Sequence, residues 1–318
     1  MAAIAVVGAA GFVGGNLVKA LVSDGHRVKG IDLVPPDGAT RLAPVMDKKR
    51  DLEFEYVWKS ALDLAEDDID DVDVVIYLAA QADVPLGISS PTFTFQQNVM
   101  SVVHYMDLLT RPGIEPPRTI YMSSESVYGV VPKEFQPIRE DAPLNPTNAY
   151  AVSKMCAEAV VRAYAAQFNL NATVLRSTTL FGPNSRTKQV VPIFIRQALQ
   201  GKDITVEGDG SQSRDFNYVG NMIRGIYLAL ERDIPGTFNI GSGREVSIKE
   251  LAEKVIETVR GLGVETESKV VFGPWRPGEQ GVQLSVSIDK ARDLLGYTPL
   301  LTLEEGLHET VRWWAKHI

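Results

Sequence analysis

The first part of the chain alternates short apolar runs with stretches of helical spacing, and this alternation restricts the possible folds more than any other feature. The apolar runs, which we expect to be strands, are Ala3–Val7, Arg27–Ile31, Val72–Leu78, Thr119–Met122 and Ala172–Leu175. Helical spacing occupies Phe12–Ser23, Thr94–Leu109 and Tyr150–Phe168. Strands alternating with helices form βαβ units, and runs without polar alternation fit strands covered on both faces. The pattern predicts an α/β fold with a doubly wound parallel sheet.

The sequence pattern changes after about Phe181. Glycine, proline, asparagine and charged residues interrupt shorter elements, as in Gly208-Asp209-Gly210 and Gly241-Ser242-Gly243. We interpret residues 181–318 as a smaller α/β substrate domain that closes over the carboxyl edge of the first sheet, and residues 1–180 as the first domain. A strand near residues 237–242 is expected to return to the first sheet, and Leu303–Lys316 is expected to be an amphipathic helix.

Composition narrows the class of protein. The chain of 318 residues has a formal net charge of −8, which argues against a nonspecific nucleic-acid binder because such a protein needs a basic face. Its one cysteine, Cys156, excludes an internal disulfide and a cysteine-rich metal site, so we expect no metal. No apolar run is long enough to span a bilayer, and the apolar start lacks a basic region. We therefore expect a cytoplasmic protein without a membrane partner.

Three glycines lie where the first strand becomes the first helix, in Gly8-Ala-Ala-Gly11-Phe-Val-Gly14. Gly8 permits a tight turn, Gly11 lets a pyrophosphate approach the backbone, and Gly14 lets the helix pack against the strand. A purely structural turn is the alternative. Asp32 follows the second apolar run, where its carboxylate can accept hydrogen bonds from the ribose hydroxyls of a dinucleotide. Because it would repel a 2′-phosphate, it favours NAD over NADP.

A tyrosine and a lysine are four residues apart in the predicted helix that begins at Tyr150. Tyr150 and Lys154 therefore share one helix face, and a nearby ammonium group lowers the pKa of a phenol. An ordinary exposed helix pair is the alternative. Ser124 follows a buried strand, and ligands bind at the carboxyl ends of strands in doubly wound sheets. A serine there can hydrogen-bond an oxygen that loses its proton.

Further motifs occur along the whole chain. They are Leu78-Ala79-Ala80, Asn98, the segment Ser123 to Gly129, Arg176, Phe181-Gly182-Pro183, the run Gly208 to Phe216, the run Phe238 to Gly243, and Arg276-Pro277-Gly278-Glu279. With the glycine turn and the Tyr150/Lys154 pair, they make the chain resemble the NAD-dependent sugar epimerase/dehydratase family of extended short-chain dehydrogenases/reductases. The resemblance implies a Rossmann-like NAD-binding domain and a second domain that binds a nucleotide sugar.

The resemblance also implies roles for individual residues. Tyr150 would remove the proton of the sugar 4-hydroxyl while the C4 hydride passes to NAD, with Lys154 tuning Tyr150 and Ser124 ordering the 4-oxygen. The residues expected to bind NAD are Gly8, Gly11, Phe12, Val13, Gly14, Asp32, Leu78, Ala79, Ala80, Asn98, Tyr150 and Lys154. Those expected to bind the nucleotide sugar are Ser124, Glu125, Thr179, Arg186, Val191, Arg214, Arg276 and Glu279. The family further implies a homodimer formed by helices around residues 95–110 and 150–166.

Some positions depart from the family pattern. Thr179 replaces an asparagine found in many sugar epimerases, and both Thr179 and Arg186 resemble the uronic-acid 4-epimerases. Glu125-Ser126 stands where dehydratases have Asp-Glu, and decarboxylases also have a glutamate at the second position. A serine hydroxyl is a far weaker base than a carboxylate, so we expect a 4-epimerase, with UDP as the nucleotide. A dehydratase or decarboxylase is the alternative within the family, and a non-catalytic NAD-binding protein is the alternative outside it.

Overall fold

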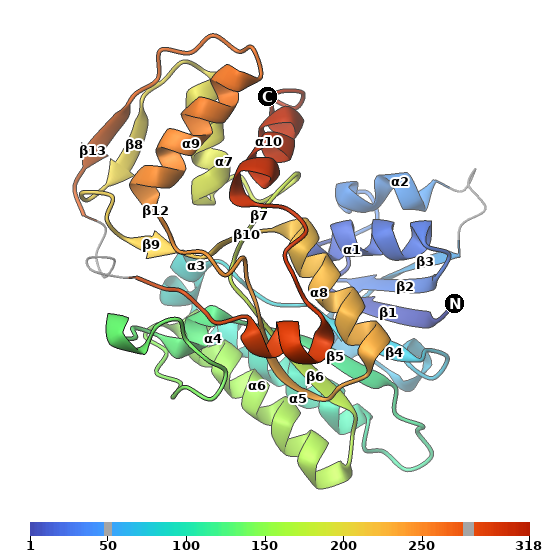
Figure 1. Ribbon diagram of the computed structural model, residues 1–318. Coiled ribbons are helices and arrows are strands. Elements are labelled where there is room, and N and C mark those ends of the chain that lie inside the picture. Colours follow the sequence, from blue (N-terminus) through green and yellow to red (C-terminus); the bar gives the residue numbers. More distant parts are fainter. Residues whose placement is uncertain (48–52, 276–282) are drawn as a thin grey trace. The chain divides into compact units, whose positions relative to one another are not determined.

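The computed structural model describes residues 1–47, 53–275 and 283–318, and the chain divides into two compact units (Figure 1). The first unit comprises Met1–Gly129, Pro143–Arg176 and Gly225–Phe238, and the second comprises Val130–Ala142, Ser177–Arg224 and Asn239–Ile318. The main division therefore falls between Arg176 and Ser177, and each unit also takes in a segment from the other side of it.

A seven-stranded sheet forms the centre of the first unit, in the order β3-β2-β1-β4-β5-β6-β11. The strands are β1 (Ala3–Val7), β2 (Arg27–Asp32), β3 (Phe54–Trp58), β4 (Val74–Tyr77), β5 (Arg118–Ser124), β6 (Ala172–Ser177) and β11 (Gly236–Ile240). The pairs β3/β2, β2/β1, β1/β4 and β4/β5 are parallel. This is the doubly wound order, so the expected Rossmann-like α/β class is confirmed. Sheets of this kind bind ligands at the carboxyl ends of their strands, beside the point where the strand order reverses.

Helices cover both faces of this sheet (Figure 1). They are α1 (Phe12–Ser23), α2 (Ala43–Met46), α3 (Val84–Ser89), α4 (Pro91–Phe95), α5 (Ser101–Leu108), α6 (Ala149–Phe168) and α8 (Val219–Arg232), which begins in the second unit. Helix α6 is the longest of them, with 20 residues. The Asn148 side chain accepts a hydrogen bond from the Ala151 amide at its start, and Asn169 ends it in the left-handed conformation.

Two elements of the first unit differ from the sequence prediction. The helix expected over Thr94–Leu109 is divided by a π-helical turn at Gln96–Met100, and such turns are frequent at functional sites. Strand β3 was not predicted, because it is an edge strand with no fully buried residue and so lacks a continuous apolar run. Short 3₁₀ turns connect other elements of the chain, at Thr40–Leu42, Ala61–Asp63, Glu66–Asp68, Glu125–Tyr128 and Lys133–Phe135.

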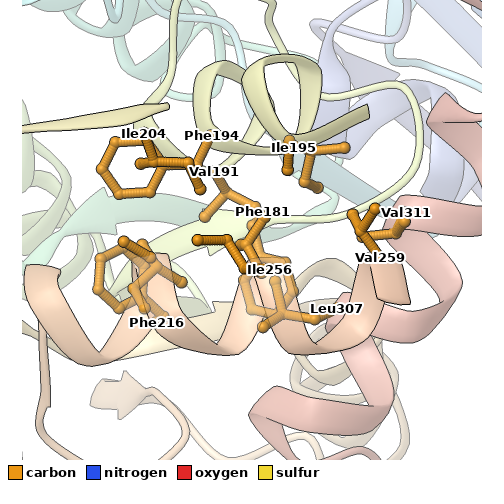
Figure 2. Close-up of a cluster of buried hydrophobic side chains, with 14 of the residues drawn as sticks. Phe181, Val191, Phe194, Ile195, Ile204, Phe216, Ile256, Val259, Leu307 and Val311 are labelled. Atoms are coloured by element: carbon orange, nitrogen blue, oxygen red, sulfur yellow. The ribbon is translucent and has the colours of Figure 1, made fainter. Parts of the chain in front are cut away.

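The second unit packs three helices against short paired strands. Its elements are β7 (Thr179–Phe181), α7 (Val190–Leu199), β8 (Ile204–Glu207), β9 (Ser213–Arg214), β10 (Phe216–Tyr218), β12 (Val246–Ser247), α9 (Ile248–Gly261), β13 (Val270–Gly273), the π-helical turn Ala291–Leu295 and α10 (Leu303–Trp314). Figure 2 shows side chains of α7, α9 and α10 around Phe181, which is 1% exposed. This cluster supplies the core of the second unit. Among the described residues, no helix has both the length and the apolar character needed to cross a membrane.

Candidate active site

The glycine turn after β1 is shaped by two close backbone approaches. Gly8 has φ +93, and a Cβ there would lie 2.6 Å from the Ala79 nitrogen. A Cβ on Gly14 would lie 2.1 Å from the Gly8 carbonyl oxygen, so both positions require glycine. Gly11 is the exposed N-cap of α1 and offers no side-chain acceptor to the first-turn amides. Those N–H groups and the positive end of the helix dipole fit a pyrophosphate.

The Asp32 carboxylate is held at the end of β2 by two backbone amides. Its Oδ2 accepts from the Ala10 amide at 2.8 Å, and its Oδ1 accepts from the Val34 amide at 3.0 Å. An ionised carboxylate has about four acceptor positions, so these bonds leave room for ribose hydroxyls. Burial together with the Asp32 charge raises the pKa of nearby Tyr56 to about 12. Asp32 and the glycine turn are therefore joined through Ala10, and together they fit the adenosine half of NAD.

Asn98 connects the loop after β4 to helix α6. Its Oδ1 accepts from the Gln81 amide at 2.6 Å, and its Nδ2 donates to the Gln81 carbonyl at 2.9 Å and to the Ser153 hydroxyl at 2.8 Å. Asn98 is 1% exposed and lies in the π-helical turn. The predicted cofactor residues Leu78, Ala79 and Ala80 are in the same loop, and they become progressively more exposed along it. Asn98 thus fixes this loop beside the residue that precedes Lys154.

Ser124 is the last residue of β5 and the N-cap of the following 3₁₀ turn. Its side chain is at a 9% exposed position and accepts a hydrogen bond from the Ser126 amide. The two hydroxyl oxygens of Ser124 and Ser126 lie 2.6 Å apart. Glu125 is 5% exposed between them. The carboxyl end of this buried strand therefore presents two linked serine hydroxyls and one largely buried carboxyl side chain.

Lys154 is a buried cation on α6, one turn beyond the partly exposed Tyr150. It is 2% exposed; its Nζ donates to the Met122 carbonyl at 2.5 Å and lies 4.4 Å from the centre of the Tyr121 ring. Burial lowers the pKa of Lys154 from 10.5 to about 7, against the opposing effect of the Glu158 charge. Burial also raises the pKa of Tyr121 well above its ordinary value. Sequence reasoning predicted the Tyr150/Lys154 face but not this environment, whose groups come from β5.

The predicted substrate residues of the second unit have different surroundings. Thr179 begins β7, and its amide donates to the Asp215 carbonyl at 3.1 Å, which places it next to Arg214 in the same unit. Arg214 is partly exposed, and its Nη1 donates to the Ser213 carbonyl. Arg186 is exposed, whereas Val191 is 2% exposed within the hydrophobic cluster of Figure 2. The Val191 side chain therefore has a packing role. The expected positions Arg276 and Glu279 lie outside the described residues.

Asp215 was missed by sequence reasoning, although it directly follows Arg214. It is fully buried and accepts hydrogen bonds from the Ser242 amide at 2.8 Å, the Ser242 hydroxyl at 2.6 Å and the Gly243 amide at 3.0 Å. Burial raises the pKa of Asp215, and these hydrogen bonds oppose the rise. The predicted Gly241-Ser242-Gly243 loop is thus bound to the strand that bears Arg214. The sequence signal that could have indicated Asp215 is its position between an arginine and a phenylalanine with which a strand begins.

A dinucleotide turn, an acidic residue at the end of β2, and a Tyr150/Lys154 pair on the helix whose lysine contacts β5 define an extended short-chain dehydrogenase/reductase. The model of the NAD dependent epimerase/dehydratase family matches residues 4–241, and the chain belongs to this family. Its cofactor is NAD, and the glycine turn and Asp32 carry the features that NAD requires.

Relatives of several activities have comparable similarity to the chain. The UDP-glucose 4-epimerase of Mycolicibacterium smegmatis is 30% identical, over 97% of this chain and 97% of that protein. UDP-glucuronic acid decarboxylase 1 of Danio rerio is also 30% identical, over 99% of this chain and 73% of that protein. The crystal structure of UDP-glucuronic acid 4-epimerase from Bacillus cereus, with UDP-glucuronic acid and NAD, has a TM-score of 0.87 at 29% identity and covers 99% of each chain. The chain is therefore a member of an enzyme family of NAD-dependent epimerases and dehydratases.

Proposed function

We propose that the chain is an NAD-dependent 4-epimerase of a nucleotide sugar, with UDP as the nucleotide. The similarity to UDP-sugar 4-epimerases over nearly the whole chain supports this proposal. When bound, NAD accepts a hydride from C4 of the sugar and returns it. Tyr150 takes the proton of the 4-hydroxyl, Ser124 orders the same oxygen, and Lys154 stabilises the Tyr150 phenolate. In the second unit, Arg214 binds the diphosphate.

The observation that carries the choice of epimerase is the pair of hydroxyls at Ser124 and Ser126. Elimination of water from a 4-keto sugar needs a base at C5 and an acid at the C6 oxygen. Ser126 occupies the position at which dehydratases and decarboxylases carry a glutamate, and its hydroxyl is hydrogen-bonded to that of Ser124. A serine in this arrangement lacks the basicity of a carboxylate. Without a base at C5, the 4-keto sugar retains its C5 proton and can be reduced on its other face.

The test is turnover of a panel of UDP-sugars in deuterated water, followed by NMR. Inversion at C4 with no deuterium at C5 is the expected result, and Tyr150→Phe is the control variant that should abolish it. Deuterium at C5 would refute the epimerase, and loss of the C6 hydroxyl would identify a dehydratase. Release of carbon dioxide from a uronic acid would identify a decarboxylase. No turnover of any sugar by NAD-loaded protein would favour a non-catalytic NAD-binding protein.

The panel includes sugars with and without a C6 carboxylate, because Thr179 and Arg186 favour a uronic acid. Preference for UDP-glucuronic acid, weakened by Arg186→Glu, would assign the carboxylate to this arginine. An unchanged preference in Arg186→Glu would remove it from the site.

A homodimer formed through α5 and α6 remains part of the proposal. Met100, immediately before α5, is 51% exposed, and Phe168 at the end of α6 is 44% exposed. Exposed apolar side chains of this kind favour burial in an interface. Light scattering should give twice the mass of the chain, and a monomer at working concentration would remove this element of the proposal.

A further inference from the structure

Two opposite charges are buried together in the first unit. Glu158 of α6 and Arg176 of β6 are each 1% exposed. The Arg176 Nη2 donates to the Glu158 Oε1 at 2.6 Å, and its Nε donates to the Oε2 at 3.1 Å. A buried ion pair often contributes no more stability than apolar side chains of the same volume, because both charges lose their hydration. A gain in stability is therefore not sufficient to explain why this ion pair is present.

Two further hydrogen bonds connect the pair to the two ends of one short segment, Ser123–Tyr128. The Ser123 hydroxyl donates to the Glu158 Oε2 at 2.9 Å. The Arg176 Nη1 donates to the Tyr128 hydroxyl at 2.7 Å, and its guanidinium carbon lies 4.8 Å from the centre of the Tyr128 ring. Ser123 is 1% exposed and Tyr128 is fully buried. Ser124 is the second residue of this six-residue segment, directly after the bonded Ser123.

The same pair is attached to the helix that carries Tyr150 and Lys154. Glu158 lies four residues after Lys154 and eight after Tyr150, so all three project from one face of α6. The ion pair is thus one of the connections between the Ser123–Tyr128 segment, which holds Ser124, and the face of α6 that carries Tyr150 and Lys154.

We propose that the Glu158–Arg176 ion pair is a positioning device, which holds Ser124 in place relative to Tyr150 and Lys154 by binding the Ser123–Tyr128 segment at both ends. The importance of that placement rests on the proposed function, in which Ser124 and Tyr150 contact one oxygen of the sugar. Proton transfer requires these groups within hydrogen-bond reach, and a displacement of about 1 Å can reduce a rate about 100-fold. Glu158, Arg176, Ser123 and Tyr128 are thus positioning residues, which act through Ser124.

The test compares two substitutions of the same kind. Tyr128→Phe deletes only the hydroxyl that accepts from Arg176. Tyr105→Phe is the matched control, because Tyr105 is also buried, at 1% exposed, and its hydroxyl lies 2.7 Å from that of Thr119, which is outside the Ser123–Tyr128 segment. Both variants should lose similar thermal stability. Only Tyr128→Phe should lower kcat, by about 10- to 100-fold with KM for the nucleotide sugar unchanged, because the displaced group acts on the reacting oxygen. Equal kcat in the two variants would overturn the proposal.

A second readout does not depend on the sugar. The Ser126 amide donates to the Ser124 hydroxyl, and the Gly129 amide donates to the Ser126 carbonyl, so both amides report the order of the turn. Hydrogen exchange followed by mass spectrometry should show at least tenfold faster exchange of these amides in Tyr128→Phe and in Ser123→Ala, and wild-type rates in Tyr105→Phe. Unchanged exchange in the first two variants would refute the positioning role. Faster exchange in protein that turns over no sugar would leave the positioning intact and refute the proposed function.

Discussion

The buried Lys154 ammonium makes the stability of the fold depend on pH in a predictable direction. The pKa of Lys154 is lowered from 10.5 to about 7 by burial. Below pH 7 the lysine is charged in both the folded and the unfolded chain, so the full cost of burying the charge is present. Between pH 7 and 10.5 the folded protein releases a proton that the unfolded chain retains, and the free energy of unfolding rises. Over this interval the free energy of unfolding rises by a total of about 4–5 kcal/mol, at about 1.4 kcal/mol per pH unit.

Lys154→Met removes this titration while keeping a side chain of similar length. We expect the variant to gain stability relative to wild type at pH 7, because an apolar group replaces a charge that is 2% exposed. The difference between the two proteins should then shrink by about 2–3 kcal/mol from pH 7.5 to pH 9.5. Tyr121, which touches the ammonium, does not titrate in this window because its pKa is raised well above its ordinary value.

The assay is urea unfolding of both proteins at four pH values, after NAD has been removed from each. Contributions to the free energy of unfolding that do not involve Lys154 are the same in both proteins, so they cancel in the slope of the difference against pH. A difference that stays constant from pH 7.5 to 9.5 would show that the pKa of Lys154 is not lowered. A difference that grows with pH would contradict the direction of the pKa shift, because it would mean that the folded protein binds the Lys154 proton more tightly than the unfolded chain.

Four further substitutions test the site, and a fifth serves as a control. Tyr150→Phe should lower kcat by about 10²–10⁴-fold with binding of the nucleotide sugar unchanged in calorimetry, because only the ionisable oxygen is lost. Asp32→Ala should reduce the ratio of NADP to NAD dissociation constants, and an unchanged ratio would contradict the repulsion argument. Gly14→Ala should abolish NAD binding by displacing the Gly8 carbonyl, whereas Gly261→Ala, with no atom within 4 Å of the added carbon, should bind NAD normally and unfold at a higher temperature. Arg214→Ala should weaken nucleotide-sugar binding by about 1.5–3 kcal/mol, with NAD binding retained.

Patterns that are local in the sequence were sufficient to predict most of the helices and strands of the first unit. Continuous apolar runs predicted the buried strands, and the glycines of the first turn predicted the close approaches of Gly8 and Gly14. Strand β3 could not be predicted from apolar runs, because an edge strand needs no continuous apolar run. The π-helical turn at Gln96–Met100 could not be predicted either, since the helical spacing of apolar residues continues through the turn and gives no local signal.

Properties that depend on distant segments could not be predicted. The pKa of Lys154 is lowered by burial and raised by the Glu158 charge. Its ammonium contacts groups of β5 more than 30 residues earlier, and nothing in the spacing of Tyr150 and Lys154 specifies them. The partnership of Glu158 with Arg176 joins a helix to a strand in the same way. Val191 was assigned by resemblance, and the packing of its side chain in the core of the second unit likewise depends on segments that are distant in the sequence.

In the proposed reaction, the burial that destabilises the Lys154 ammonium also strengthens its interaction with the Tyr150 phenolate. A tyrosine of ordinary pKa, about 10, needs roughly 4 kcal/mol of phenolate stabilisation to ionise near pH 7. Two opposite charges about 4 Å apart attract by only about 1 kcal/mol when water surrounds them fully, but by about 4 kcal/mol at the effective dielectric of about 20 that also describes buried sites in proteins. A lysine on an exposed helix face would therefore be too weak, whereas one withdrawn from water reaches the required magnitude. The Glu158 charge raises the pKa of Lys154 against the effect of burial, and so favours the ammonium form that the phenolate needs. The expected pair of residues and the unexpected carboxylate one turn further along α6 thus support the same proton transfer.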